Sequence, residues 1–364
     1  MSALLFLAGL VALVVGADLL VRGASKLALS FSISPLVVGL TIVAFGTSAP
    51  EVAVSVGAVL NGQTDIAMGN VVGSNIFNVL FILGVSALIT PLVVNVQLIR
   101  QEVPIMIGAS LLLLALGLDG RLDLWDGALL LSLLLAYTVF LVLQSRRETQ
   151  AARDEYAQEN KPANPGAWDS RLPAQLALIA VGLLLLVYGS EWLVTAAVSF
   201  AKAMGVSDLV IGLTVVAAGT TMPEVATSIT AAIKGERDIA VGNVVGSNTF
   251  NILGCLGVSG LVAGGMPAGD ALQVAPALLS FDIWVMLAVA LACLPVFMSG
   301  HQIARWEGGV FLLYYVAYVA HLILAAQQHD ALQPYSWAMM SFVLPLTLIT
   351  LVVVLLRQRS ARPS

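Results

Sequence analysis

The chain has 364 residues, of which 59% are hydrophobic and only 10% are charged, and its mean hydropathy is +0.97. Soluble domains carry about 25% charged residues, so this composition excludes a soluble globular protein and indicates one that resides in the lipid bilayer. The modest net charge of −5, without a basic patch, argues against a nucleic-acid partner. Cys255 and Cys293 lie in apolar runs and are interpreted as small hydrophobic residues, not as a disulfide or a metal site.

Runs of about 20 apolar residues, the length that crosses a bilayer, predict transmembrane helices along the whole chain. We expect eleven spans, at residues 2–23, 34–60, 65–89, 99–117, 123–143, 173–197, 207–233, 238–264, 280–299, 304–326 and 335–356. The polar segment 144–172 contains Pro162 and Pro165 and is predicted to be a loop between them. No basic stretch precedes the first apolar run, which therefore predicts a first span and not a cleaved signal.

The basic residues separate by side of the membrane when the N-terminus is placed outside. Of the 16 Lys and Arg residues, only Arg121 and Lys202 then fall on the outer side. Because Lys and Arg accumulate in cytoplasmic loops, this predicts an external N-terminus and a cytoplasmic C-terminus. A missed or invented span would mix the two sides, so the separation also supports the span count.

Two blocks of sequence repeat each other at a constant offset of 173 residues. Residues 39–78 match residues 212–251, and the offset joins Glu51 to Glu224 without a gap. Each block contains Gly-Thr-Ser or Gly-Thr-Thr, then Pro-Glu, and later Gly-Asn-Val-Val-Gly-Ser-Asn. Five spans repeat as five spans, and an odd number inverts the second copy in the membrane. Inverted repeats are typical of secondary transporters, although a channel can also be built from them.

The repeat divides the chain. We predict an all-α membrane protein made of a first five-helix repeat at 1–143, a polar cytoplasmic loop at 144–172, a second inverted five-helix repeat at 173–326, and an additional eleventh helix with a basic cytoplasmic tail at 327–364.

Glu51 and Glu224 lie well inside apolar spans, where a charge costs at least a few kcal/mol. A protonated or hydrogen-bonded structural glutamate is the alternative to a functional one. Each glutamate follows a proline, which removes a helical hydrogen bond and clashes with the carbonyl four residues back. Proline also disfavours helical angles at the preceding residue, here Ala49 and Met222. We therefore expect both helices to break there and to free backbone carbonyls, a plain proline kink being the alternative.

Oxygen-bearing side chains surround the two expected breaks. They are Thr47, Ser48, Ser74 and Asn78 in the first copy, and Thr220, Thr221, Ser247 and Asn251 in the second. The serine and asparagine of each copy are four residues apart and share a helix face, which Gly69, Gly73, Gly242 and Gly246 would allow to pack closely. Singly, each could be a contact between helices. Together with the glutamates they form a hard-cation ligand set suited to Ca²⁺ or Na⁺.

Other acidic residues carry weaker signals. Asp65 and Asp238 open spans and are predicted to cap their helices. Glu102 and Asp282 lie near span starts, where an acidic side chain suits the helix dipole. No motif of an intramembrane enzyme accompanies them, so we expect neither an enzyme nor a bound cofactor.

The doubled motifs resemble the alpha repeats of the cation/calcium antiporter superfamily, and its prokaryotic sodium/calcium exchangers in particular. The resemblance covers residues 1–326 and implies a ten-helix core of antiparallel repeats in the plasma membrane, here a bacterial inner membrane. It implies that Ca²⁺ and Na⁺ are transported ions and not cofactors. It also implies that Glu51 and Glu224 hold Ca²⁺, that the eight oxygen-bearing side chains named above are ligands, and that the carbonyls of Ala44 and Ala217 join them.

Two positions depart from the family pattern. Thr221 replaces the usual serine and keeps its hydroxyl, whereas Asn251 stands where some relatives have aspartate. One ionisable group fewer argues against potassium co-transport. The resemblance therefore predicts Ca²⁺/Na⁺ exchange and leaves Ca²⁺/H⁺ exchange and a passive cation channel as alternatives.

Overall fold

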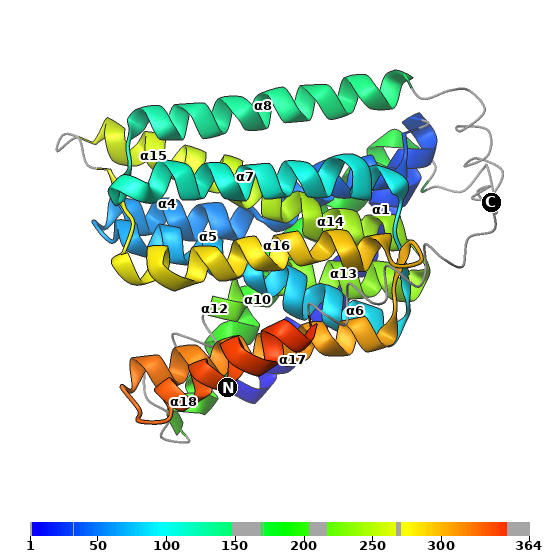
Figure 1. Ribbon diagram of the computed structural model, residues 1–364. Coiled ribbons are helices and arrows are strands. Elements are labelled where there is room, and N and C mark those ends of the chain that lie inside the picture. The colour runs from blue at the N-terminus through cyan, green and yellow to red at the C-terminus, as the bar shows by residue number, and fades with distance from the viewer. Residues whose placement is uncertain are drawn as a thin grey trace, which may run out of the picture.

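The computed structural model describes residues 2–31, 33–147, 169, 171–203, 217–266 and 271–347. In these ranges the chain is helical apart from two short strand pairs, and its long helices run side by side (Figure 1). Eight described helices are long and apolar enough to cross a membrane, and the bent pair Pro35–Thr47 with Ala49–Leu60 makes a ninth candidate span. The prediction of an all-helical, multi-pass membrane protein is therefore confirmed.

The first half contains, in order, α1 (Ser2–Phe31), α2 (Pro35–Val38), η1 (Gly39–Val43), α3 (Ala44–Thr47), α4 (Ala49–Leu60), α5 (Thr64–Phe77), η2 (Asn78–Leu83), α6 (Gly84–Ile89), β1 (Leu92–Val93), η3 (Leu98–Glu102), α7 (Val103–Leu116), η4 (Gly117–Asp119), β2 (Arg121–Leu122) and α8 (Leu124–Arg147). The second half contains α10 (Leu172–Ala203), α12 (Ala217–Gly219), α13 (Met222–Lys234), α14 (Arg237–Phe250), η7 (Asn251–Cys255), α15 (Leu256–Gly265), β3 (Leu272–Gln273), η8 (Leu278–Asp282), α16 (Ile283–Met298), β4 (Gln302–Ile303), α17 (Arg305–Ala326), α18 (Leu332–Ala338) and η9 (Met339–Val343).

Most helix ends lie within about two residues of the predicted spans, but α1, α8 and α10 continue past them, to Phe31, Arg147 and Ala203. Hydropathy ends a span at the first charged residues, whereas a helix ends only where its backbone bonds stop, and Lys and Arg are good helix formers. The predicted spans 207–233 and 335–356 each lie partly outside the described residues, as does most of the loop 144–172. The count of eleven therefore stays a prediction.

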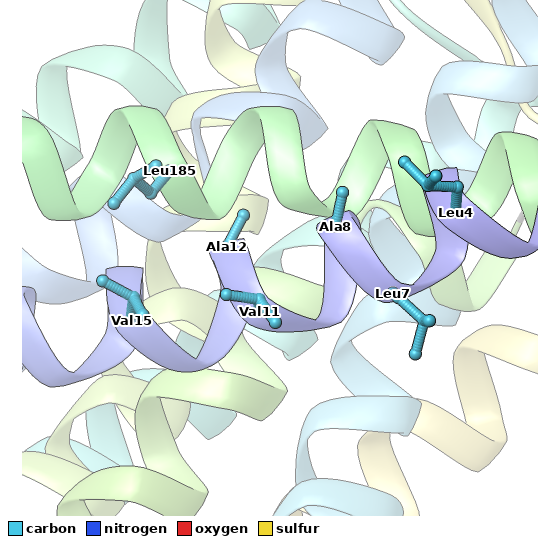
Figure 2. Close-up of a pocket in the computed structure, with 7 residues that line it drawn as sticks. All are labelled: Leu4, Leu7, Ala8, Val11, Ala12, Val15 and Leu185. Atoms are coloured by element: carbon cyan, nitrogen blue, oxygen red, sulfur yellow. The ribbon is translucent and has the colours of Figure 1, made fainter.

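α1 and α10 cross in contact through glycines. A Cβ atom on Gly9 would lie 2.8 Å from the Gly189 carbonyl oxygen, and one on Gly182 would lie 2.8 Å from that of Gly16. Residue numbers rise along α1 as they fall along α10, so the two helices are antiparallel. Small residues at such crossings let backbones approach closely in a bilayer. Beside the crossing, residues of α1 between Leu4 and Val15 line an apolar groove, and Leu185 of α10 lies near Ala12 and Val15 (Figure 2).

Two antiparallel strand pairs join connecting segments of opposite halves. β1 pairs with β4, and β2 pairs with β3. One further backbone hydrogen bond lies next to each strand pair. The N–H of Val94 donates to the His301 carbonyl at 2.8 Å, and that of Val274 donates to the Gly120 carbonyl at 2.9 Å. Each pair joins segments that the charge distribution assigns to one side of the membrane. The two halves are thus fastened together at both ends of the helices.

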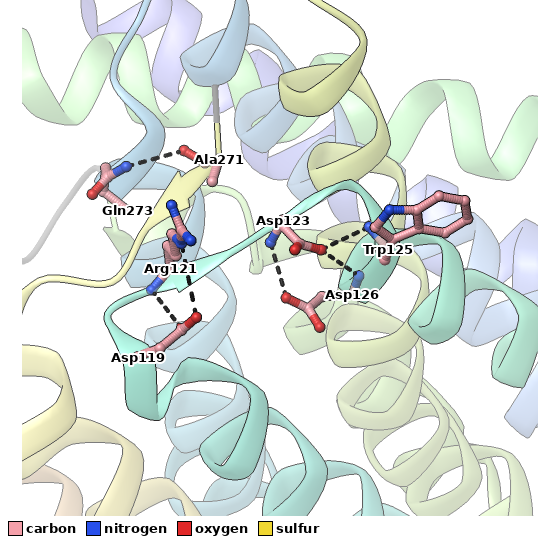
Figure 3. A network of polar contacts seen from close by, with 7 residues as sticks. All are labelled: Asp119, Arg121, Asp123, Trp125, Asp126, Ala271 and Gln273. Carbon is pink, nitrogen blue, oxygen red and sulfur yellow. Dashed lines mark hydrogen bonds and ion pairs between the residues drawn. The ribbon is translucent and has the colours of Figure 1, made fainter. Parts of the chain in front are cut away.

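The start of α8 is fixed by carboxylates beside β2 (Figure 3). Asp123 accepts hydrogen bonds from the backbone N–H groups of Trp125, at 2.8 Å, and Asp126, at 3.0 Å. Asp126 in turn accepts from the backbone N–H of Asp123 at 2.9 Å. These bonds pair N–H groups that have no partner within the helix, so this acidic cluster is a helix cap.

The helix from α14 to α15 lies at the centre of the fold and is buried throughout its most apolar stretch. It packs on η1 and α3, where Cβ atoms on Gly39, Gly242 and Gly246 would each lie within 3.1 Å of the opposite backbone. The expected close approach at Gly242 and Gly246 is therefore present. A Cβ atom added to Gly69 or Gly73 would have no atom of another described element within 4 Å. The residues of the second half that match η1 lie outside the described ranges.

Ion pairs hold the C-terminal half of α1. Lys234 Nζ lies 2.5 Å from Asp18 Oδ1, and the Arg22 guanidinium lies 2.7 Å from Asp169 Oδ2. Ser25 Oγ also donates to Glu236 Oε1 at 2.7 Å. These contacts tie α1 to the turn between α13 and α14 and to the segment preceding α10.

The Arg22–Asp169 pair predicts an acid-dependent loss of stability. The hydrogen bond from Arg22 holds the pKa of Asp169 below its ordinary value of 3.8. The pair therefore stabilises the fold above that ordinary pKa, and the contribution disappears as pH falls through the lowered one. We expect Asp169→Asn to lower the thermal unfolding midpoint in detergent at pH 7, with the difference shrinking towards zero at strongly acidic pH. An equal difference at every pH would contradict this, and Asp65→Asn, at an exposed position, is the control.

Candidate cation-binding site

Both motif helices are interrupted at a hydroxyl residue. The axes on either side of Ser48 differ by 41°. Ser48 has φ −82° and ψ 7°, and Thr221 has φ −89° and ψ 3°. The expected breaks are therefore present, but the prediction that Ala49 and Met222 leave helical angles is wrong, because they begin α4 and α13. Proline is tolerated in a first helical turn, where its missing N–H has no acceptor, so the irregular residue lies one position earlier.

A freed carbonyl is captured by a neighbouring helix in the second half. Pro223 cannot donate to the carbonyl of Gly219, and the hydroxyl of Ser190 on α10 donates to it instead. Both residues are buried. A backbone group without a partner at membrane depth is costly, which explains a buried serine at this position of α10.

Ser190→Ala tests this explanation. Removing the hydroxyl leaves a buried carbonyl without that bond, and we expect a destabilisation of about 1–3 kcal/mol, measured as a lower midpoint of thermal unfolding in detergent. Ser132→Ala is the matched control, since Ser132 is exposed and donates to the carbonyl of Ala128 within its own helix. Equal midpoints for the two variants would contradict the explanation.

The two buried glutamates face groups of the opposite half. Ser48 Oγ donates to Glu224 Oε1 at 2.9 Å. The Glu51 carboxylate lies beside Thr220 and Thr221 and is near enough to Glu224 for the two charges to interact. Both glutamate side chains are wholly inaccessible to solvent. Two carboxylates that share an enclosed space repel each other when both are ionised, unless a cation lies between them.

Several oxygens at this place have no hydrogen-bond partner among the described residues. They are both carboxylate oxygens of Glu51, Glu224 Oε2, Asn78 Oδ1, Asn251 Oδ1 and Ser247 Oγ. Buried polar atoms are paired in the great majority of cases, so such a set calls for a ligand. Five of these six atoms are carboxylate or amide oxygens, and a group of acceptor oxygens around two carboxylates is suited to a cation.

The other predicted ligands lie around the same point. Ser74 Oγ and Thr221 Oγ1 are 3.3 Å apart, and the hydroxyl of Thr47 lies 3.4 Å from the carbonyl oxygen of Ala44. Ala217 begins α12, immediately before the second break. Asn78 and Asn251 each begin a π-helical turn, a local widening that often occurs at functional sites. The structure therefore brings the two copies of the motif together.

The donor set is one of oxygen atoms around two carboxylates. Within the described ranges no three His, Cys, Asp or Glu side chains gather as a metal-binding group. Carboxylate, hydroxyl, amide and carbonyl oxygens suit Ca²⁺ and Na⁺ better than transition metals. Near the site, the thiol of Cys255 lies 3.4 Å from the Glu51 carbonyl oxygen, so this cysteine is a small buried neighbour.

Sequence reasoning missed some polar residues and misread others. It assigned no role to Ser190 or to the first and last asparagines of the Gly-Asn-Val-Val-Gly-Ser-Asn motif. Asp65 and Asp238 are not helix caps, because Gln63 and Glu236 precede those helices and both acids lie in the first turn.

Glu102 and Asp282 are also more than acids near a helix dipole. The Tyr137 hydroxyl donates to Glu102 at 2.6 Å, and the Tyr318 hydroxyl donates to Asp282 at 2.8 Å. The tyrosine in the following span, which is half-buried in the structure, was the available signal. These pairs lie outside the cation-binding site described above.

The fold and the site together define a multi-pass membrane protein with an enclosed cluster of unpartnered oxygen atoms. Comparison with known proteins gives a family, since the model described as sodium/calcium exchanger protein matches residues 1–143 and 174–324. The chain belongs to this family, whose members are exchangers.

Similar proteins are known in bacteria and archaea. The inner membrane protein YrbG of Escherichia coli is 38% identical over 287 residues, which are 79% of this chain and 86% of YrbG. The sodium/calcium exchanger MaX1 of Methanosarcina acetivorans is 34% identical over 348 residues, 88% of this chain and 97% of MaX1. Among solved structures, the sodium-calcium exchanger NCX_Mj superposes with a TM-score of 0.73 at 31% identity, covering 88% of this chain and 97% of its own.

Proposed function

We propose that the chain is a secondary active antiporter that exchanges Ca²⁺ for Na⁺ across a plasma membrane by alternating access. The observation that carries the proposal is the cluster of unpartnered acceptor oxygens around Glu51 and Glu224. Two carboxylates balance one Ca²⁺ or two Na⁺, which is the simplest basis for exchange at a shared site. The names of MaX1 and NCX_Mj as sodium/calcium exchangers support the same pair of ions.

We further propose two inverted five-helix repeats with an additional eleventh helix, an external N-terminus and a cytoplasmic C-terminus. Support comes from the antiparallel crossing of α1 with α10 and from the matched strand pairs β1·β4 and β2·β3. The proposed order of spans puts both members of each strand pair on the same side of the membrane in either orientation, and the separation of the basic residues favours an external N-terminus. A bacterial inner membrane agrees with the name of the relative YrbG.

In this proposal the ligands of the ions are the twelve groups named from the sequence. The glutamates supply charge, whereas the hydroxyl, amide and carbonyl oxygens set the number and spacing of contacts. Ions enter from one side at a time, because the site is enclosed by the helices of both halves. No cofactor takes part, and the ions are the cargo.

Reconstitution into proteoliposomes tests the proposal. Vesicles loaded with Na⁺ and diluted into Na⁺-free medium with ⁴⁵Ca²⁺ are expected to accumulate Ca²⁺ above its external concentration. A pH gradient of either sign, with Na⁺ equal on both sides, is expected to drive no accumulation. Accumulation driven by the pH gradient alone would establish Ca²⁺/H⁺ exchange, and flux that only equilibrates Ca²⁺ under every gradient would establish a channel. Either result overturns the proposal.

A further inference from the structure

Two asparagines outside the proposed ligand set join the two halves directly. The side-chain amide of Asn75 donates to the backbone carbonyl of Asn248 at 3.1 Å, and that of Asn248 donates to the carbonyl of Asn75 at 3.2 Å. Both side chains are almost fully buried. These reciprocal bonds fasten α5 to α14, and they do not involve the Oδ1 atom of either asparagine.

Each of those Oδ1 atoms accepts a bond from a proposed ligand of the opposite half. Asn251 Nδ2 donates to Asn75 Oδ1 at 3.1 Å, and Asn78 Nδ2 donates to Asn248 Oδ1 at 2.9 Å. An amide is planar, so fixing its nitrogen also fixes where its oxygen points. The Oδ1 atoms of Asn78 and Asn251 are the ones left buried and unpartnered. The bonds therefore turn each amide so that its oxygen, and not its N–H₂ group, is available.

A second pair of asparagines does the same for two hydroxyls. Thr47 Oγ1 lies 3.1 Å from Asn243 Oδ1 and donates to it, and Thr220 Oγ1 donates to Asn70 Oδ1 at 3.4 Å. The side-chain nitrogens of these two asparagines donate to other groups. Asn70 Nδ2 donates to Ser55 Oγ at 3.1 Å, and Asn243 Nδ2 donates to Ser228 Oγ at 2.9 Å. A hydroxyl has one proton, so a threonine that donates it to asparagine keeps only lone pairs for a further contact.

We infer that Asn70, Asn75, Asn243 and Asn248 are positioning residues, each of which turns a ligand of the opposite half so that only its oxygen lone pairs face the cation. The inference rests on the proposed cation site. All four bonds run in one direction, with the ligand donating and the positioning residue accepting. A cation needs that polarity, whereas a contact that served only to pack helices would not require it. The orientation of each half's ligands therefore depends on the other half.

A double-mutant cycle tests the pairing. Asn75→Ala is expected to weaken equilibrium binding of ⁴⁵Ca²⁺ to the purified full-length protein by about 10- to 100-fold, the usual effect of losing a group that orients a metal ligand. In a protein that already carries Asn251→Ala, adding Asn75→Ala is expected to weaken Ca²⁺ binding by less than about twofold, because the amide that Asn75 orients is already absent. In a protein that carries Asn78→Ala instead, adding Asn75→Ala is expected to weaken Ca²⁺ binding by the same factor as in the wild type. Asn61→Ala, at an exposed asparagine, is the control.

Each outcome decides one question. An equal effect of Asn75→Ala in both backgrounds, or no effect in the wild type, overturns the inference and leaves the proposed function standing. A wild-type protein that binds no Ca²⁺ overturns the proposed function itself. If Asn75→Ala is not monodisperse, the matched cycle of Asn248→Ala with Asn78→Ala and with Asn251→Ala makes the same test with the partners exchanged.

Discussion

Glu51→Gln is expected to abolish Ca²⁺ transport in proteoliposomes, and Glu224→Gln is expected to do the same. Glutamine has the shape of glutamate but lacks its charge, and it replaces one oxygen by an N–H₂ group that repels a cation. Removing one charged partner from a buried ionic arrangement costs about 3–5 kcal/mol, which is about 100-fold or more in affinity. Neither carboxylate can compensate for the other, because the proposed site needs both negative charges to balance one Ca²⁺.

The expected loss is specific to the site. Both variants should elute as monodisperse protein, since relieving the repulsion between two enclosed carboxylates favours the fold. Glu191→Gln is the matched control, because it makes the same chemical change at a glutamate that is exposed on α10. Wild-type exchange by either glutamine variant would remove that glutamate from the site, and a loss of transport in Glu191→Gln would show that the assay reports something other than the site.

Gly182→Ala is expected to have the largest effect on stability. Its new Cβ atom would lie 2.7 Å from the backbone nitrogen of Leu20 and 2.8 Å from the carbonyl oxygen of Gly16. Backbone atoms cannot turn aside as a side chain can, so α1 and α10 must separate. Overpacking of this kind costs about 1–3 kcal/mol, and loosening a crossing of this length places the value at the upper end. The measurement is the thermal unfolding midpoint in detergent.

Gly57→Ala is the matched control for that variant. It makes the same substitution inside α4, where no described residue lies within 4 Å of the new atom. Alanine is the better helix former, so this variant is expected to be as stable as the parent or slightly more so. Equal midpoints for Gly182→Ala and Gly57→Ala would contradict the close crossing of α1 and α10.

The amino-acid sequence predicted the features that depend on local pattern. Apolar runs located the helices, and the constant offset identified matched positions, so Glu51 and Glu224 could be paired from the sequence alone. The break in each helix was predicted from proline, but its position was one residue off. The reason is that each proline lies in the first turn of the second helix, where its missing N–H has no helical acceptor, so the irregular residue is the one before that turn.

Contacts between distant helices could not be predicted in the same way. The hydrogen bonds from Asn251 to Asn75 and from Ser190 to Gly219 depend on which helix faces which, and periodicity within one helix does not report that. The motif contained the asparagines, but the sequence does not distinguish an asparagine that binds the cation from one that accepts a hydrogen bond from a cation ligand. Glu102 was misread for the same reason, since its partner Tyr137 belongs to another span.

Competition between the two ions at equilibrium tests the central claim most directly. Purified wild-type protein in detergent is titrated with ⁴⁵Ca²⁺ at increasing NaCl, with ionic strength held constant by a large organic cation. We predict saturable Ca²⁺ binding that Na⁺ displaces fully, with the apparent affinity falling more steeply than the first power of Na⁺ concentration, because the proposed site needs more than one Na⁺ to balance its two carboxylates. Ca²⁺ binding that saturating Na⁺ leaves unchanged would contradict a shared site at Glu51 and Glu224.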